Sequence, residues 1–253
     1  RYVFYHADVI AMPSPLMFYE FCRRRSVLPK KHVVYAPAGV DFDKIRRIKE
    51  GYAKEYREHR KNQFVVGFVG LLEWWQGVDI LVEAIHLIEK EGNLKIKLLI
   101  IGDGPQRAKV ESLCKRLKVD CVITGSLPHE KALEKMIELD ALVVPRRKSS
   151  VTESVIPIKV IEAWALGIPI IITGHKVFEA IGAKDNEHII ICEPNPLDVA
   201  NKIKKILLSK ELRERLSING KIIAKKFDYA YIAEEIIRCV LSDKHKNITT
   251  LVL

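Results

Sequence analysis

Short apolar runs alternate with amphipathic helical patterns along most of this chain. Seven runs are candidate strands, and most of them are apolar without interruption: residues 32–36, 64–69, 96–101, 121–124, 141–144, 169–173 and 188–192. Continuous apolar runs are typical of strands that are buried on both faces of a parallel sheet. The alternation therefore predicts an α/β fold, a doubly wound parallel sheet with right-handed crossovers.

The segments between these runs have the periodicity of helices with one apolar face. In residues 78–91, for example, apolar side chains recur at helical spacing while Glu and Lys fill the opposite face. The other helices predicted between strands are residues 106–117, 129–138, 157–166 and 196–208, and two more follow at 210–226 and 229–241. The chain after Pro194 is thus predicted to be entirely helical.

The first thirty residues do not join the alternation. They contain a strand-like run at 3–10 and a helical pattern at 15–25, and the chain does not begin with Met. We interpret residues 1–30 as the remnant and linker of a preceding domain and residues 31–228 as one domain. Residues 229–253 are predicted to form a C-terminal helix and tail that cross toward the preceding domain.

The net charge limits the classes of partner that this chain is expected to bind, and the cysteines indicate the cellular compartment. Lys and Arg number 42 against 32 Asp and Glu, a formal net charge of +10, which favours an anionic partner such as a phosphorylated small molecule or a membrane surface. Nucleic acid is disfavoured, because no recognised motif or aromatic interleaving accompanies the basic residues. Five scattered cysteines without a CxxC pair indicate free thiols in a reducing compartment, hence a cytoplasmic location. The abundance of Ile, Lys and Glu also suits a heat-adapted source.

The loops after the strands form the candidate site, because ligands of doubly wound sheets bind beyond the carboxyl ends of the strands. These loops are residues 70–76, 102–105, 125–128, 146–156 and 174–177. Four of the five begin with glycine, which permits tight turns and close approach of the backbone to a ligand.

The helix predicted at 157–166 carries the strongest constellation. Pro157 suits its first position, which leaves the N–H groups of Ile158 and Lys159 at the positive end of the helix as an anion site. Glu162 follows one turn after Lys159, so both side chains project to the same side. A nucleoside diphosphate fits this pattern, with phosphates at the helix N-terminus and Glu162 accepting the ribose hydroxyls. The alternative is a plain surface pair of Lys159 and Glu162.

An ordered set of motifs resembles the C-terminal half of glycosyltransferase family 4, the group 1 glycosyltransferases. The motifs are YAPAGVD, FVG-x-L, GVDILVEAI, LLIIGDGP, ITGSL, ALVVPR and IEAWALGIPIIIT, and they extend from about Val33 to the final helix. The resemblance implies a GT-B enzyme, of which this chain is the Rossmann-like, donor-binding domain. It also implies transfer with retention of configuration, no metal and no cofactor beyond the donor, with a UDP- or GDP-sugar expected.

The resemblance assigns roles to several residues. Glu162 matches the second glutamate of the family's E-x7-E motif, which binds ribose. Gly70 falls in the loop that approaches the donor phosphates, and Gly125, Ser126 and Leu127 fall in the loop that lines the base. The catalytic groups on the acceptor side are implied to lie in the N-terminal domain, so we expect this chain to bind donor and transfer little or no sugar.

Four positions depart from the family pattern, one of them being Pro157, which stands where the family's E-x-F-G has its glycine. Leu71 and Gln76 stand where the family has an arginine and a lysine that neutralise the diphosphate, and Ser154 stands where the first glutamate of E-x7-E holds the donor sugar. A buried diphosphate requires paired positive charge. We therefore hypothesise that the nearby cations replace the missing ones: Arg146, Arg147, Lys148 and Lys159.

Other features are open to two interpretations. Asp41 and Asp43 form a DxD pattern that binds metal in another glycosyltransferase fold, but the resemblance implies a linker there. Trp74 and Trp75, in the first loop, are either a hydrophobic cap on the neighbouring helix or an apolar wall facing the cleft. His175 is either a ligand contact or a surface histidine.

The whole chain also has alternative interpretations. The leading one is a transferase acting on a glycan or lipid-linked acceptor, with peripheral contact to the inner face of the membrane. The alternatives are a degenerate nucleotide-sugar-binding or regulatory module without activity, and a GT-B sugar-nucleotide epimerase.

Overall fold

The computed structural model describes residues 9–14, 16–17, 32–57, 63–92, 94–174 and 176–241. Its centre is a parallel sheet with the strand order β5-β4-β3-β6-β7-β8. The strands are β3 (Phe64–Val69), β4 (Ile96–Ile101), β5 (Cys121–Ile123), β6 (Ala141–Val144), β7 (Ile170–Thr173) and β8 (Ile190–Cys192). The order runs outward in both directions from β3 and β6, which is the doubly wound arrangement. The predicted α/β fold is confirmed.

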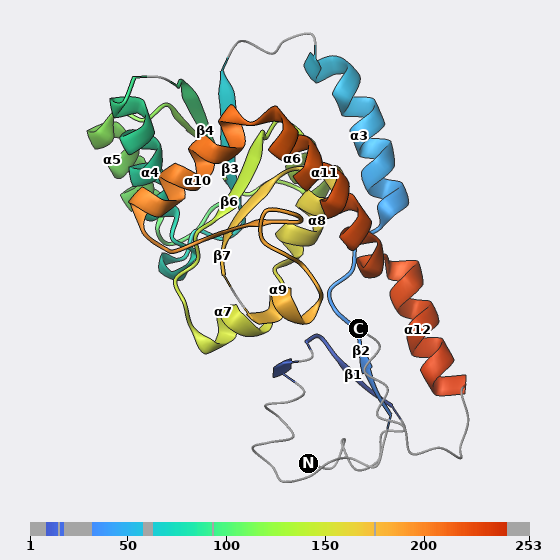
Figure 1. Cartoon of the computed structure of the whole chain (residues 1–253). Helices are drawn as coiled ribbons and strands as arrows, with labels where there is room; N and C mark the ends of the chain where they lie inside the picture. The colour runs from blue at the N-terminus through green and yellow to red at the C-terminus, as the bar shows by residue number, and fades with distance from the viewer. Residues whose placement is uncertain are drawn as a thin grey trace.

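Helices cover both faces of this sheet (Figure 1). One face packs against α4 (Val78–Lys90), α5 (Arg107–Leu117) and α10 (Pro196–Leu208). The other packs against α3 (Phe42–Arg57), α6 (His129–Met136) and α8 (Ile158–Leu166). The helix α11 (Lys210–Ala224) contributes residues to both apolar clusters. Along β3, Val65 belongs to one apolar cluster and Val66 to the other, because successive side chains of a strand point to opposite faces. The uninterrupted apolar runs in the sequence thus reflect two cores, one on each face.

Several short elements and one longer helix, α12, complete the sheet edge and the C-terminal part of the described chain. They are η1 (Trp74–Gln76), α7 (Ser150–Ser154), α9 (Lys176–Ala180), η2 (Lys225–Phe227) and α12 (Tyr229–Leu241). The side chain of Ser149 accepts a hydrogen bond from the N–H of Thr152, and the Oγ1 of Thr152 accepts one from the N–H of Ser149, so α7 begins with a reciprocal cap. Within the described residues, no helix combines the length and the apolar character that crossing a bilayer demands.

The strand predicted at 32–36 lies outside the main sheet. It forms β2 (His32–Tyr35), which pairs in parallel with β1 (Val9–Met12) in a separate two-stranded sheet. Our assignment of this run to the strand-helix alternation was therefore wrong. Its β pattern was real, but its pairing partner precedes it in the chain. In Figure 1, α12 extends beyond α11 to reach this sheet, and α12 contacts both of its strands.

The domain boundaries stay predictions. The β1–β2 pairing crosses the boundary that we predicted at residue 30. Most of the predicted strand 3–10 and helix 15–25 lie outside the described residues.

The helix α3 was not identified from the sequence. Asp41 caps its start, since its Oδ1 accepts the N–H of Lys44 at 2.8 Å. Asp43 in the first turn pairs with Arg46 at 2.9 Å. The two aspartates of the DxD pattern therefore serve the start of a helix. The inner face of α3 places Ile45 in the core.

Candidate functional site

The first two loops at the carboxyl edge pack backbone against backbone. The N–H of Gly70 donates to the carbonyl of Ile101 at 2.9 Å. Gly102 has a φ of +147°, and a Cβ built there would lie 2.0 Å from the carbonyl oxygen of Gly70. Only glycine fits such a position, so the first loop is held tightly over the end of β4.

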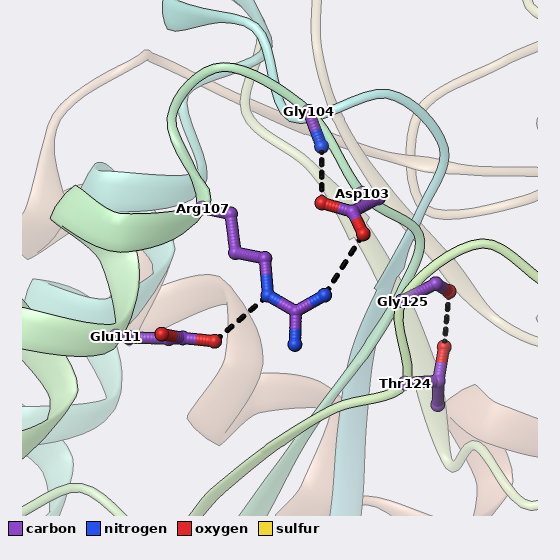
Figure 2. Close-up of polar contacts among 6 residues, drawn as sticks. All are labelled: Asp103, Gly104, Arg107, Glu111, Thr124 and Gly125. Carbon is purple, nitrogen blue, oxygen red and sulfur yellow. Dashed lines mark hydrogen bonds and ion pairs between the residues drawn. The ribbon is translucent and has the colours of Figure 1, made fainter.

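An arginine is bonded to the second loop and lies beside the third (Figure 2). Arg107, at the start of α5, donates to Asp103 and to Glu111, each at 2.8 Å. Gly125 in the third loop has a φ of +73°, and a Cβ there would lie 3.3 Å from Nη1 of Arg107. The loop of Gly125 therefore rests on the Asp103–Arg107 pair. Beyond Gly125, Ser126 is exposed and Leu127 is half-buried.

The helix α8 begins one residue later than predicted. Pro157 is its N-cap residue, with extended backbone, and the first helical residue is Ile158, which is exposed. The predicted anion-binding end, formed by the N–H groups of Ile158 and Lys159, is unaffected by this shift. The side chains of Lys159 and Glu162 are both buried, with exposed fractions of 8% and 6%. They are therefore not a solvent-exposed surface pair.

A fully buried tryptophan anchors α8 in the core. The indole N–H of Trp164 donates to the carbonyl of His188 at 2.9 Å. Its ring meets Phe178 edge-on at 6.1 Å between centroids and lies 6.3 Å from the ring of Phe227. A Cβ on Gly220 of α11 would lie 2.7 Å from the indole. Two aromatic rings, one backbone carbonyl and the close approach of Gly220 thus fix the helix that carries Lys159 and Glu162.

The ammonium group of Lys159 lies at the first loop. A Cβ on Gly70 would lie 2.9 Å from its Nζ, and Nζ donates to Oε1 of the buried Gln76 at 3.3 Å. It also lies 4.1 Å from the centre of the Phe68 ring. Burial and the positive charge of Arg146 lower the pKa of Lys159 to about 7, against an opposing effect of Glu162. A neutral amide and an aromatic face are weak partners for a buried cation.

A second buried cation lies nearby. Arg146 is 6% exposed, and its guanidinium lies 5.2 Å from the centre of the Trp75 ring. Its Nη1 donates to the carbonyl of Thr152 at 3.5 Å, and its Nε has no hydrogen-bond partner among the described residues. Burial lowers the pKa of Arg146 to about 10. The carboxyl edge thus holds two cations with little compensating negative charge.

The next two cations of the same loop are paired. Arg147 makes two hydrogen bonds to the carboxylate of Asp79, at 2.8 and 3.1 Å, and a third to the carbonyl of Trp74. Burial would raise the pKa of Asp79, but Arg147 outweighs it and holds that pKa below its usual value. Lys148 pairs with Glu193 at 2.9 Å. Of the run PRRK, only Arg146 is left with a buried, unpartnered nitrogen.

The two tryptophans of the first loop contact these arginines. Trp74 is 61% exposed, and the guanidinium of Arg147 lies 5.7 Å from its ring centre. Trp75 is half-buried and holds Arg146 in the same way. Neither of our two interpretations included an arginine partner. The rings fix the loop after β6 against the loop after β3.

Glu162 faces a cavity and is held by a histidine. Nε2 of His129 lies 2.6 Å from Oε1 of Glu162, and the side chain of His129 is 60% exposed. Both residues line a cavity of about 310 Å³, together with Val40, Leu133 and Tyr229 among others. Sequence reasoning missed His129, because it precedes Glu162 by 33 positions and belongs to another helix.

The remaining predicted residues are spread along the edge. Leu71 points outward and is exposed, whereas Ser154 ends α7 and is half-buried. Gly70, Gln76, Arg146 and Lys159 are the predicted residues that the fold brings together most closely. His175 lies outside the described residues.

Cysteines and possible metal ligands lie apart from this cluster. Cys114 and Cys192 are buried free thiols, as predicted, and Cys121 is free and half-buried. Cys22 and the side chain of Cys239 lie outside the described residues. In the described part of the chain, no three His, Cys, Asp or Glu side chains are grouped as metal ligands would be.

Comparison with known proteins places this chain in a family. The model of the glycosyl transferases group 1 family matches residues 53–222, more than half of the chain. The chain belongs to this family. A relative, the uncharacterized glycosyltransferase MJ1069 of Methanocaldococcus jannaschii, is 24% identical over 189 residues. Those residues cover 74% of this chain and 47% of the relative, so the chain spans about half the length of the curated relatives it matches.

Solved structures of other proteins share the fold. HepE of Anabaena, solved in complex with UDP, superposes with a TM-score of 0.75 at 17% identity, over 94% of this chain and 64% of that one. The C-terminal domain of the group 1 protein LpcC from Francisella tularensis is covered completely, with a TM-score of 0.60 at 18% identity over 76% of this chain. The described sheet and helices thus have the architecture of a GT-B C-terminal domain.

Proposed function

We propose that this chain is the donor-binding part of a retaining, metal-independent glycosyltransferase that uses a nucleoside-diphosphate sugar, a UDP- or GDP-sugar. The observation that carries the proposal is the pair of buried cations at the carboxyl edge. Lys159 and Arg146 are both withdrawn from water beside a glycine loop, and neither has a full counter-charge. A diphosphate would supply that counter-charge.

The proposal assigns each part of the donor to a part of the edge. The diphosphate lies between the Gly70 loop, Lys159 and Arg146. The ribose lies at Glu162, and the base lies along the loop of Gly125. Arg147, which we included among the candidate phosphate ligands, is assigned to fixing the loop through Asp79.

The acceptor side belongs to the proposal only in outline. The catalytic groups for transfer would come from an N-terminal domain of the same polypeptide, packed near β1, β2 and α12. The acceptor is a glycan or a lipid-linked glycan. A net charge of +10 supports work at an anionic membrane surface.

A thermal-shift screen with UDP, GDP, ADP and TDP tests the donor assignment. Calorimetry then compares the nucleoside, its monophosphate and its diphosphate for the base that binds best. We expect the diphosphate to bind at least about tenfold more tightly than the monophosphate, since one charge-assisted contact in a buried site is worth roughly 1.5–3 kcal/mol. A diphosphate that binds no more tightly than its monophosphate would contradict the assignment of Lys159 and Arg146.

A second candidate is a regulatory module that has lost donor binding. The observation that favours it is the loss of the two family cations at Leu71 and Gln76. It predicts that no nucleotide in the panel stabilises the protein.

A further inference from the structure

His129 and Glu162 form a pair at the mouth of the cavity beside α8. Glu162 is almost completely buried, whereas His129 is mostly exposed and reaches across from the first turn of α6. A carboxylate can only accept hydrogen bonds, so Nε2 of His129 carries the proton that the 2.6 Å contact requires.

This contact determines which acceptor positions of the Glu162 carboxylate remain available to a ligand. A carboxylate has about four acceptor positions, and His129 occupies one of them on Oε1. The other positions remain for donors that enter from the cavity of about 310 Å³. A side chain that is held by one donor keeps its rotamer, and pre-organised acceptors lose less entropy when a ligand binds.

We propose that His129 is a positioning residue that orients Glu162 toward the two hydroxyls of a ribose and thereby sets the preference for ribonucleotides over 2′-deoxyribonucleotides. This rests on the proposed function, which puts the ribose at Glu162. It adds a residue that neither the sequence motifs nor the family pattern assigns.

The competing role for His129 is purely structural, as a tie between α6 and α8. The two roles predict different results. If His129 only holds α6 against α8, its substitution lowers the stability of the protein and weakens the binding of all nucleotides equally. A lost positioning contact weakens mainly those ligands that use both hydroxyls.

The test compares one nucleoside diphosphate with its 2′-deoxy form, UDP and dUDP being the first pair, by calorimetry on the full chain. The variants are His129→Ala, His129→Gln and the control Lys131→Ala. Lys131 lies on the same helix but pairs with Glu134 at the surface. Glutamine retains an N–H donor at a similar distance from the backbone, so His129→Gln should restore the preference for UDP over dUDP.

We expect the wild-type chain to prefer UDP about tenfold, because one hydroxyl bonded to a carboxylate is worth roughly that much. The preference should fall to about twofold or less in His129→Ala and return in His129→Gln, with Lys131→Ala unchanged. An unchanged UDP/dUDP ratio in His129→Ala, or an equal loss for both ligands, would overturn the proposal. Such a result would leave the proposed function intact, because that function fails only if the wild-type chain binds no nucleoside diphosphate.

Discussion

Replacing Lys159 with Met should make the protein more stable while it loses affinity for the diphosphate. The lysine is buried over Phe68 with the neutral Gln76 as its partner, so folding must remove a charge from water or release its proton. Methionine has a similar shape and no charge. A residue kept at such a cost to stability is best explained by a ligand that needs it.

The pKa of Lys159 gives the size of the effect. It falls from the ordinary 10.5 to about 7, which corresponds to about 4 to 5 kcal/mol at roughly 1.4 kcal/mol for each pH unit. Loss of the hydrogen bond to Gln76 offsets about 1 kcal/mol of the gain. We therefore expect Lys159→Met to gain roughly 2–4 kcal/mol near pH 7, or a rise in Tm of about 5–10 °C for a chain of this size.

The sign of the pH dependence separates charge from packing. Between pH 7 and 10.5 the unfolded chain binds more protons than the folded one, so the wild type gains stability as the pH rises through this window. The advantage of Lys159→Met should thus be full at or below pH 7 and shrink to under about 1 kcal/mol by pH 10. Urea denaturation at pH 6.5 and pH 10 measures this difference in stability between Lys159→Met and the wild type, with a substitution at an exposed lysine, Lys131→Met, as the control.

Two results would refute this reasoning. A Lys159→Met variant that is less stable than the wild type at pH 6.5 would show that the lysine is well compensated in the folded protein. A gain of the same size at both pH values would assign the effect to packing. In calorimetry, the diphosphate should bind about 10- to 100-fold more weakly to the variant, the equivalent of one lost charged contact.

Three further predictions follow from the same edge. Affinity for UDP should fall about 50-fold between pH 7 and pH 9, because a phosphate-bound Lys159 must be protonated, whereas with a pKa of about 7 free Lys159 is half protonated at pH 7 and almost fully neutral at pH 9. Isothermal titration in buffers of different ionisation enthalpy should show proton uptake on binding, and an affinity that does not change with pH would contradict this prediction. Gly102→Ala should cost about 3 kcal/mol or more, since its Cβ would collide with the carbonyl of Gly70 at positive φ; an unchanged urea midpoint would refute this. A double-mutant cycle on Arg147→Ala and Asp79→Ala should give a coupling of about 1–3 kcal/mol, and additive losses would mean that the pair does not hold the loop.

The sequence predicted the fold well, because most strands of the main sheet are continuous apolar runs, and such runs predict strands that are buried on both faces. It was less informative at element edges. The helix α3 carries many charged side chains and buries few apolar ones such as Ile45, so the segment is polar overall, although its few apolar residues do recur at helical spacing. The strand β2 has a β pattern, but no local pattern shows which strand it pairs with.

The candidate site was predictable where it depends on local geometry. The spacing of Lys159 and Glu162 follows from helix periodicity, and the fold places both at the carboxyl edge. The run PRRK could not be resolved into roles, because consecutive side chains after a strand point in opposite directions. Arg146 is buried and Arg147 reaches Asp79. The contact of His129 with Glu162 joins two helices, and no local sequence pattern predicts it.

The packing of Trp164 against Gly220 has a consequence for anyone who builds chimeras within this family. The indole leaves no room for a side chain at position 220, so a C-terminal segment from a relative with any larger residue there would push on α8. Because the proposed donor site includes Lys159 and Glu162 of α8, we expect the graft to change nucleotide affinity without replacing any of the proposed ligand contacts. A working exchange must therefore move Trp164 and the segment from α11 to Phe227 together.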